Sequence, residues 1–422
     1  MLRVFLQVVV LLTTATSTSG DCSLRDFGAV GDGVADDSVA VAAAIAACAN
    51  GGTVVVPAGR YLTRGGIELT SNMAFEVQHG ATVLLTTNRS LIPVQEDGHY
   101  APFLSAYQAT NISIFGEGTL DGQGSVWWNF NTSQQEKPWF LYFEDVDRLR
   151  IFGVSLVNPP FWTVHPRRCH DVHIHDITIS CDPPQIHFNT DGIDPDACTD
   201  VLIEDVDYSC GDDAVAIKAS VQGAPGSRAR VGFAQPSCRP TRNVTVRRLK
   251  SGGRGGFTIG SEMQGGIEDV LFSNCTSTGV SGIRISAQQK RGGYIRNVRF
   301  EDMIFDWPGD AFVFKNKSFV LTVDQDYGSG GDPCPGMGPS AEFFNFSFKN
   351  LTITHSPSGL RIGHITCPDA ASCLDVSIDG LQFLDVPRPI PLTCANIHGS
   401  QVGVDPPENS ACHMLNLPVA FV

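Results

Sequence analysis

The segment VHIHDITIS, at positions 172–180, is followed 29 positions later by VLIEDVDYS, at 201–209, and both have the same pattern. Apolar and variable residues alternate, a small or polar residue stands fifth, and the alternation then resumes. The pattern also occurs at 149–157, 244–252, 270–278, 298–306, 346–354 and 376–384. The starts lie 23 to 48 residues apart, so a repeat of about two dozen residues is sometimes lengthened by a loop.

Each repeat alternates sides as a β-strand does, but a single repeat has too little apolar surface to fold alone. If the chain coils so that each strand pairs with its equivalent one turn later, about 4.8 Å away, the apolar side chains form a continuous buried column. The sequence therefore predicts an all-β fold, a single-domain right-handed parallel β-helix. A leucine-rich repeat needs a fixed Leu and Asn framework that is missing here, and a propeller needs evenly long blades.

The composition agrees with many turns and short strands, because Gly and Pro number 43 and 25 while charged residues are 17% of the 422. A coiled repeat grows by adding turns, so this length does not require a second domain. The Ala-rich stretch at 37–50 begins with Asp37 as a candidate capping acid and predicts a short helix. We expect this helix to cover the N-terminal end of the stack.

The N-terminus has the order of a secretory signal, with Arg3, an apolar run at 4–12 and small polar residues up to Gly20. We expect residues 1–20 to be removed and residues 21–422 to form a secreted, extracellular domain. No later stretch reaches the roughly 20 apolar residues that span a bilayer, so we expect no membrane contact. Eight glycosylation sequons are consistent with export: Asn88, Asn111, Asn131, Asn243, Asn274, Asn316, Asn345 and Asn350.

Thirteen cysteines in an exported chain indicate disulfide bonds. Three pairs are close enough in sequence to be candidates: Cys367 with Cys373, Cys394 with Cys412, and Cys22 with Cys48. Because the number is odd, at least one thiol is free or joined to another chain.

The formal net charge of −15 argues against nucleic acid as a partner, because phosphates would be repelled during the approach. An anionic substrate would need local positive charge, which makes clustered arginines informative.

Three aspartates are the candidate catalytic residues. Asp191 lies in NTDGIDPDA, and the pair Asp212 and Asp213 follows 21 residues later, about one coil. Equivalent positions in neighbouring coils lie one strand spacing apart, so we expect the three carboxyl groups to meet in one open groove. Their mutual repulsion should raise at least one pKa and place an acid beside a base, as glycoside hydrolysis requires. The alternatives are aspartates that only form turns, or a calcium site.

Beyond these acids, the chain resembles the family 28 glycoside hydrolases, the polygalacturonases, over nearly the whole mature length. The resemblance is carried by DFGAVGDGVADD, GTLDGQGSVWW, NPPFWTVHP, the NTD and GDD segments, GSEMQGG and RGGYIRNV. It implies an inverting hydrolase of α-1,4-galacturonosyl linkages in pectin, a monomer that needs no metal or cofactor. In such an enzyme Asp212 donates the proton, while Asp191 and Asp213 position or deprotonate the water.

The resemblance also implies four substrate-binding residues: Asn189, Arg254, Arg284 and Tyr294. Two family motifs are altered, because Arg254 replaces a histidine in Gly-His-Gly and Ser286 replaces the lysine of Arg-Ile-Lys. Arg254 could restore the missing positive charge, since a guanidinium grips a carboxylate with two parallel hydrogen bonds. Tyr294 either contacts sugar or packs.

The sequence leaves several alternatives open. An insertion between Lys218 and Arg242 resembles those of exo-acting members of the family and favours cleavage from a chain end. Other candidates are a rhamnogalacturonan or xylogalacturonan hydrolase, a calcium-dependent lyase of pectate, and a carbohydrate-binding wall protein with impaired catalysis. Three tryptophans are either core residues or sugar-stacking surfaces: Trp127, Trp128 and Trp162.

Overall fold

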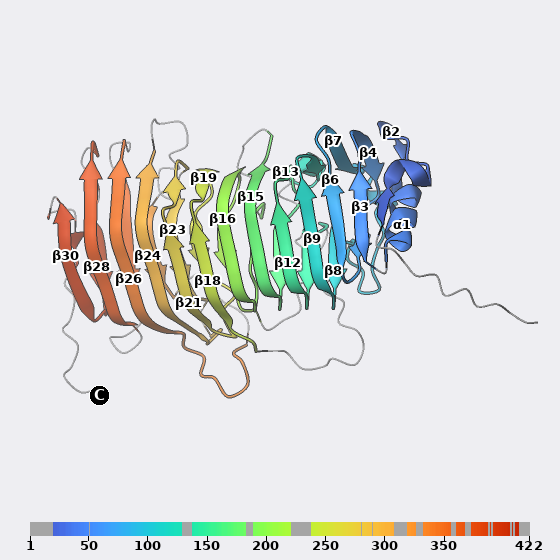
Figure 1. The fold of residues 1–422 in the computed structure, drawn as a ribbon. Helices are drawn as coiled ribbons and strands as arrows, with labels where there is room; N and C mark the ends of the chain where they lie inside the picture. The colour runs from blue at the N-terminus through green and yellow to red at the C-terminus, as the bar shows by residue number, and fades with distance from the viewer. Residues whose placement is uncertain are drawn as a thin grey trace, which may run out of the picture.

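The protein is a parallel β-helix in the computed structural model (Figure 1). The structure describes residues 20–49, 51–128, 137–182, 189–220, 238–279, 281–288, 290–307, 319–325, 332–355, 360–367, 373–386, 389, 391–405, 407 and 410–412. Within these ranges every ladder between named strands is parallel, and each strand pairs with strands of the coils before and after it. The predicted all-β class and coil stacking are confirmed.

The strands form three ladders that run along the stack. The first contains β1 (Asp21–Ser23), β3 (Gly52–Val56), β6 (Met73–Val77), β9 (Thr110–Gly116), β12 (Asp147–Phe152), β15 (His170–Ser180), β16 (Thr199–Cys210), β18 (Thr241–Arg247), β21 (Ile267–Ser273), β24 (Tyr294–Asp306), β26 (Glu342–Thr354), β28 (Cys373–Leu384) and β30 (Gly399–Asp405). The second contains β2 (Asp32–Asp36), β4 (Gly59–Thr63), β7 (Ala81–Leu85), β10 (Thr119–Asp121), β13 (Ser155–Val157), β19 (Lys250–Gly253) and β22 (Thr276–Ser277), and it joins the long strands of the first.

The third ladder is a separate sheet and carries the candidate active site. Its strands are β5 (Ile67–Leu69), β8 (Leu104–Tyr107), β11 (Leu141–Glu144), β14 (Val164–Arg167), β17 (Val215–Ile217), β20 (Phe257–Ile259), β23 (Ser281–Ser286), β25 (Phe319–Asp324), β27 (Arg361–Thr366), β29 (Leu392–Ala395) and β31 (Ser410–Ala411). Single bridges from Ile193 to Val164 and to Val215 connect its two halves.

The fifth residue of each repeat forms a corner of the coil. In all eight repeats it has a left-handed backbone, with φ between 52° and 82°. These residues are Gly153, Asp176, Asp205, Arg248, Asn274, Asp302, Asn350 and Gly380. Gly, Asn and Asp adopt this conformation most readily, which explains why the position is small or polar in most repeats.

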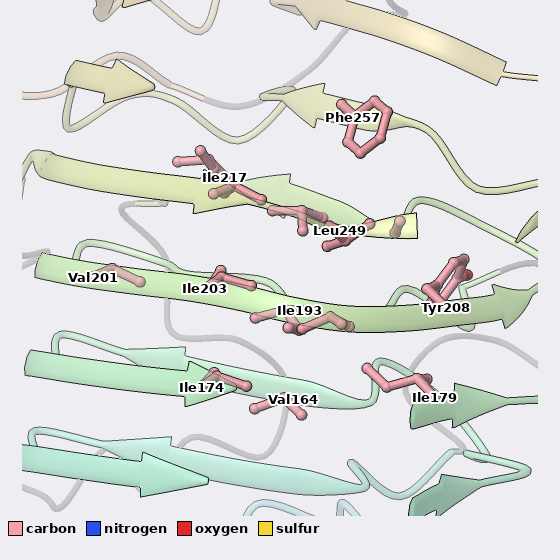
Figure 2. Close-up of a cluster of buried hydrophobic side chains, with 14 of the residues drawn as sticks. Val164, Ile174, Ile179, Ile193, Val201, Ile203, Tyr208, Ile217, Leu249 and Phe257 are labelled. Carbon is pink, nitrogen blue, oxygen red and sulfur yellow. The ribbon is translucent and has the colours of Figure 1, made fainter. Parts of the chain in front are cut away.

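The interior is a column of stacked apolar side chains. Figure 2 shows part of it, where Ile174 and Ile203 lie on neighbouring coils and point to the same side. Further along, the ring centres of Phe272 and Phe300 are 4.8 Å apart, and Phe348 continues the stack. Full burial of one large apolar side chain contributes about 1.5–3 kcal/mol, so the column is the main source of stability.

Helix α1 (Ser38–Ala47) packs on β1, β5 and the 3-10 turn Leu24–Phe27 at the N-terminal end of the stack (Figure 1). The predicted capping helix is therefore present. Asp37 stands at its N-cap, but its carboxylate accepts hydrogen bonds from the backbone N–H groups of Val30 (2.6 Å) and Gly31 (3.1 Å). The predicted side-chain cap is wrong, because Asp37 instead ties the preceding loop to the helix.

All three predicted disulfides are present. Two long-range bonds were not predicted: Cys181–Cys210 and Cys238–Cys334. Three buried thiols remain free: Cys169, Cys198 and Cys275. The odd cysteine number is thus explained within one chain.

The predicted signal segment lies outside the described residues except for Gly20, and so does most of the insertion after Lys218, at 221–237. Two of the sequon asparagines, Asn131 and Asn316, also lie outside them. No helix in the described part of the chain is long and apolar enough to cross a membrane.

Candidate active site

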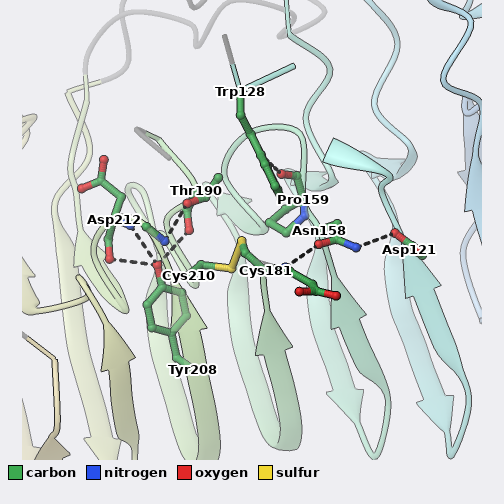
Figure 3. The surroundings of a disulfide bond; sticks show 11 residues. Asp121, Trp128, Asn158, Pro159, Cys181, Thr190, Tyr208, Cys210 and Asp212 are labelled. Carbon is green, nitrogen blue, oxygen red and sulfur yellow. Dashed lines mark hydrogen bonds between the residues drawn. A yellow bond between two sulfur atoms is a disulfide. The ribbon is translucent and has the colours of Figure 1, made fainter. Parts of the chain in front are cut away.

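The three aspartates come together at the edge between the second ladder and the third. Strand β16 ends at Cys210, which is joined to Cys181 of the preceding coil, and the turn Gly211–Asp213 follows directly (Figure 3). The backbone N–H of Gly192 donates to the carbonyl of Asp213 at 2.8 Å. This bond places Asp191 beside Asp213 on neighbouring coils, as the spacing of 21 residues predicted.

Tyr208 fixes the two turns that carry the acids. Its hydroxyl donates to the carbonyl oxygens of Thr190 (2.9 Å) and Asp212 (2.8 Å), and it accepts from the N–H of Asp212 (3.2 Å) (Figure 3). A Cβ at Gly192 would lie only 2.8 Å from the tyrosine ring. The two acid turns therefore share one buried support, and glycine makes room for it.

The acids differ in exposure. Asp212 and Asp213 are half-buried, whereas Asp191 is only 4% exposed, and its Oδ1 has no hydrogen-bond partner among the described residues. This differs from the expectation of three acids in one open groove. The reason is local packing, because the backbone of Asp191 belongs to the sheet edge that pairs with Thr163.

The environment favours protonation of Asp191 and Asp212. Burial, together with the charges of Asp194 and Asp212, raises the pKa of Asp191 well above its ordinary value, although Lys218 acts in the opposite direction. Burial and the charge of Asp213 also raise the pKa of Asp212. A carboxyl group that keeps its proton can act as a general acid, so the cluster has the properties that proton donation needs.

Three of the four predicted substrate-binding residues lie next to Asp212. The backbone N–H of Asn189 donates to Oδ2 of Asp212 at 2.8 Å. The positive charges of Arg254 and Arg284 lower the pKa of Asp212, partly offsetting burial. Both arginines are half-buried, and the Arg284 guanidinium lies 5.1 Å from the ring centre of Phe319.

Tyr294 has a different setting, at the start of β24. Arg296 lies over its ring, with 4.7 Å between the guanidinium carbon and the ring centre. A Cβ at Gly266 would overlap the ring, and Glu268 contributes to its raised pKa after burial. The described contacts of Tyr294 are therefore those of a packed residue. Ser286, in place of the family lysine, is 1% exposed.

A buried ionic cluster beside the acids was missed by the sequence reasoning. The Lys218 ammonium lies 3.5 Å from Oδ1 of Asp194 and 3.3 Å from Oε2 of Glu262, which also pairs with Arg291 at 3.3 Å. The two-residue alternation was the signal that could have found it. Asp194 follows the inward Ile193, and Lys218 follows the inward Ile217, so both side chains point outward.

The three tryptophans also separate. Trp127 and Trp128 are buried in the core, whereas Trp162 is half-buried, and its ring centre lies 4.3 Å from the Lys218 ammonium. Trp162 is thus the one of the three placed beside the acids.

Within the described residues, no group of three or more His, Cys, Asp or Glu side chains has an arrangement that could hold a metal ion.

A parallel β-helix with clustered carboxyl groups at a sheet edge is an architecture suited to polysaccharide hydrolysis. The sequence model of glycosyl hydrolases family 28 matches residues 48–407, and the chain belongs to this family. It is therefore a glycosidase.

Relatives cover most of the chain at low identity. A probable polygalacturonase of Vitis vinifera is 29% identical over 410 residues, which are 91% of this chain and 79% of the relative. An exopolygalacturonase of Zea mays is 25% identical over 92% of this chain and 90% of its own.

Solved structures show the same fold. An exopolygalacturonase from Thermotoga maritima has a TM-score of 0.69 and 24% identity, with coverage of 90% of this chain and 91% of that one. An endo-xylogalacturonan hydrolase from Aspergillus tubingensis has a TM-score of 0.70 and 20% identity, with coverage of 91% and 100%.

Proposed function

We propose that the protein hydrolyses α-1,4-galacturonosyl linkages in pectin with inversion at the anomeric carbon. Asp212 protonates the leaving oxygen, while Asp191 and Asp213 position and deprotonate the attacking water. The observation that carries this proposal is the meeting of three acids from two adjacent coils, with a raised pKa at Asp212. Inverting hydrolysis requires one acid that is protonated and one that is ionised, on opposite sides of the bond.

The arginines supply the local positive charge that an anionic polymer needs on a chain with net charge −15. Arg254 and Arg284 both act on Asp212, so a uronate bound to them would lie next to the proton donor. Arginine suits this role because its planar donors match a carboxylate. Because position 286 is serine and not the family lysine, these two arginines are the proposed ligands of the substrate carboxylate.

The test compares the wild type with Asp212→Asn on polygalacturonate. We expect the wild type to release reducing sugar with inverted configuration, and the variant to lose at least about 100-fold in kcat, because general acid catalysis typically contributes 10²–10⁴-fold. Equal sugar release from both proteins would reject hydrolysis by this site. Asp379→Asn, on the exposed face of β28, serves as the matched surface control.

We also propose that cleavage proceeds from a chain end. On the N-terminal side of the acids the outer face of the third ladder is filled by buried aromatic residues, Trp139, Tyr142 and Phe161. On the other side, the ladder carries the half-buried Arg284 and His364, and we expect the polymer to extend in that direction. The names of the Zea mays and Thermotoga maritima proteins agree with exo action. Release of single sugars without a fast fall in viscosity would support it.

Two other reactions are separated by product analysis. A calcium-dependent lyase would lose activity with a chelator and would leave a double bond in the product. A xylogalacturonan or rhamnogalacturonan hydrolase would prefer the branched polymer. The similar structure from Aspergillus tubingensis is a xylogalacturonan hydrolase, so that polymer should be among the substrates tested. A carbohydrate-binding wall protein would retain the polymer without turnover.

The proposed location is extracellular, with residues 1–20 as the signal segment and residues 21–422 as a monomeric mature domain. N-terminal sequencing of the secreted protein tests the cleavage point, and light scattering tests the monomer. A start far from Asp21 would reject this division.

A further inference from the structure

A buried column of charges leads to the acids. Glu144, Arg167, Asp196 and Lys218 occupy the same outward position in four successive coils. Their charges alternate in sign. Arg167 lies 2.9 Å from Oε1 of Glu144 through Nη1 and 3.6 Å from Oδ2 of Asp196 through Nε. The column reaches Lys218, five residues after Asp213.

The carboxylate of Asp196 already accepts hydrogen bonds from other donors. The backbone N–H of Ser220 donates to its Oδ1 at 2.7 Å, the Ser220 hydroxyl donates to Oδ2, and Nε2 of His165 lies 3.6 Å away. Lys218 instead faces Asp194 and Glu262. The Lys218 ammonium therefore pairs with carboxylates on the side of the catalytic acids, and not with Asp196 of the column.

The surroundings of Lys218 are largely shielded from solvent. Lys218 is 5% exposed, Asp194 is 0% exposed, and the Trp162 ring lies against the ammonium. Charges interact more strongly in such a site than at the surface, and a buried charge that loses its partner is costly. Each change of charge in this cluster should therefore shift the pKa values of the neighbouring carboxyl groups.

The charges around Asp191 are unequal. Asp194, Asp212 and Asp213 each oppose its ionisation, and Lys218 favours it. Tyr208 is also close, and its pKa is raised by burial and by the charge of Asp191. Glu262 shares the ammonium, and Arg291 pairs with Glu262.

We propose that Lys218 is a positioning residue that favours the carboxylate form of Asp191 against burial and its acidic neighbours, by placing a buried positive charge beside Asp194 and Glu262. This inference rests on the proposed function, in which Asp191 acts on the attacking water. It adds a residue that does not touch the substrate but sets the ionisation of one that acts in the reaction.

The first test is Lys218→Met, which keeps an unbranched side chain and removes the charge. We expect the acidic limb of the pH profile of kcat/KM to move upward by about one unit, which is about a tenfold loss below that limb. Activity should recover as the pH is raised, because Asp191 then ionises without help. A folded variant with an unmoved limb would overturn the proposal, and so would a change in KM alone.

The second test removes both charges, in Lys218→Met/Asp194→Asn. Asp194 then no longer opposes the ionisation of Asp191, so the limb should return toward that of the wild type. A purely structural role predicts the opposite, a larger loss in the double variant. This variant also keeps the proposal testable if Lys218→Met fails to fold, since it buries no unpaired charge at this site.

The third test should move the acidic limb in the opposite direction. Glu262→Gln removes the carboxylate that shares the ammonium and that raises the pKa of Asp194. The limb should move downward, whereas an upward shift would contradict the proposal. If the wild type itself hydrolyses no pectic polymer, the proposed function fails. The Lys218 inference alone fails if the wild type is active and the limbs do not move.

Discussion

At the scale of single residues, burial makes the acids both reactive and costly. Asp191 is almost fully buried, and one of its oxygens finds no hydrogen-bond partner in the part of the chain that the structure describes. A buried carboxylate without full compensation destabilises the fold, and each unit of pKa elevation corresponds to about 1.4 kcal/mol. The buried acids that the proposed reaction uses therefore lower the stability of the fold.

The substitution Asp191→Asn tests the cost of this buried acid. The pKa of Asp191 is raised in the folded state, so its contribution to stability is present below the ordinary pKa and is lost as the pH rises through the raised value. The neutral amide avoids that loss. We expect Asp191→Asn to be inactive and, at neutral pH, more stable than the wild type by about 1 kcal/mol or more.

Thermal unfolding followed from pH 3 to pH 8 measures the effect. The difference should disappear near the ordinary pKa of aspartate, where both proteins are neutral at this position. Asp379→Asn, on the exposed face of β28, is the matched control and should show little difference at any pH. A variant that is less stable than the wild type at neutral pH would contradict this account of Asp191.

The residues of the site were partly predictable. The spacing of Asp191, Asp212 and Asp213 indicated a shared edge, because equivalent positions in adjacent coils must lie side by side. The burial of Asp191 and the partners of Lys218 were not predictable from spacing. They depend on which side chains of neighbouring coils already satisfy one another, as Ser220 does for Asp196.

At the scale of elements, the corners of the coil set the register. The fifth residue of each repeat turns the strand from the first ladder to the second. A similar left-handed residue lies near the start of each first-ladder strand from β9 to β28. In β28 this second residue is Asp375, with φ of 59°. The repeat was recognisable because these corners limit which residues are allowed.

Substitution of Asp375 tests the cost of this backbone. A left-handed conformation costs a non-glycine residue roughly 1–2 kcal/mol, and a branched side chain is expected to suffer more. We expect Asp375→Val to lower the free energy of unfolding by about 1–2 kcal/mol, whereas Asp375→Gly should be neutral or slightly stabilising.

The control is Gln382→Val, an exposed position on the same strand with extended backbone, which should change stability by less than about 0.5 kcal/mol. Chemical denaturation of the three variants gives the comparison. Equal effects of valine at positions 375 and 382 would show that the corner does not constrain the residue type.

At the scale of the whole molecule, the coils are held together by strand pairing, the apolar column and five disulfides. The three remaining thiols lie inside the stack, where Cys169 and Cys275 donate to backbone carbonyls of their own and preceding coils. Burial raises the pKa of Cys275 to about 12, so this thiol stays protonated.

We expect the native protein to resist alkylation at all three thiols, because all three are buried. After unfolding without a reductant, mass spectrometry should show three alkylated cysteines, and after reduction thirteen. Fast labelling of the folded protein, or fewer than three labels after unfolding, would show that the cysteines are paired differently.

The architecture of the whole molecule was predictable because a repeated alternation leaves few ways to bury its apolar side. The long-range disulfides were not, since Cys238 and Cys334 are 96 residues apart and meet only through the stack. The position of α1 followed from the need to cover an open end, whereas the hydrogen bonds of Asp37 depended on a loop that has no repeat.

The even left-handed corners have a consequence for changes of chain length. Removing or duplicating a whole turn would leave every later side chain on the same face, inward or outward, as before. Deleting a single residue within a strand would put Val, Ile and Phe in contact with solvent from that point to the next corner. Variation in length should therefore be tolerated between turns and rejected inside them.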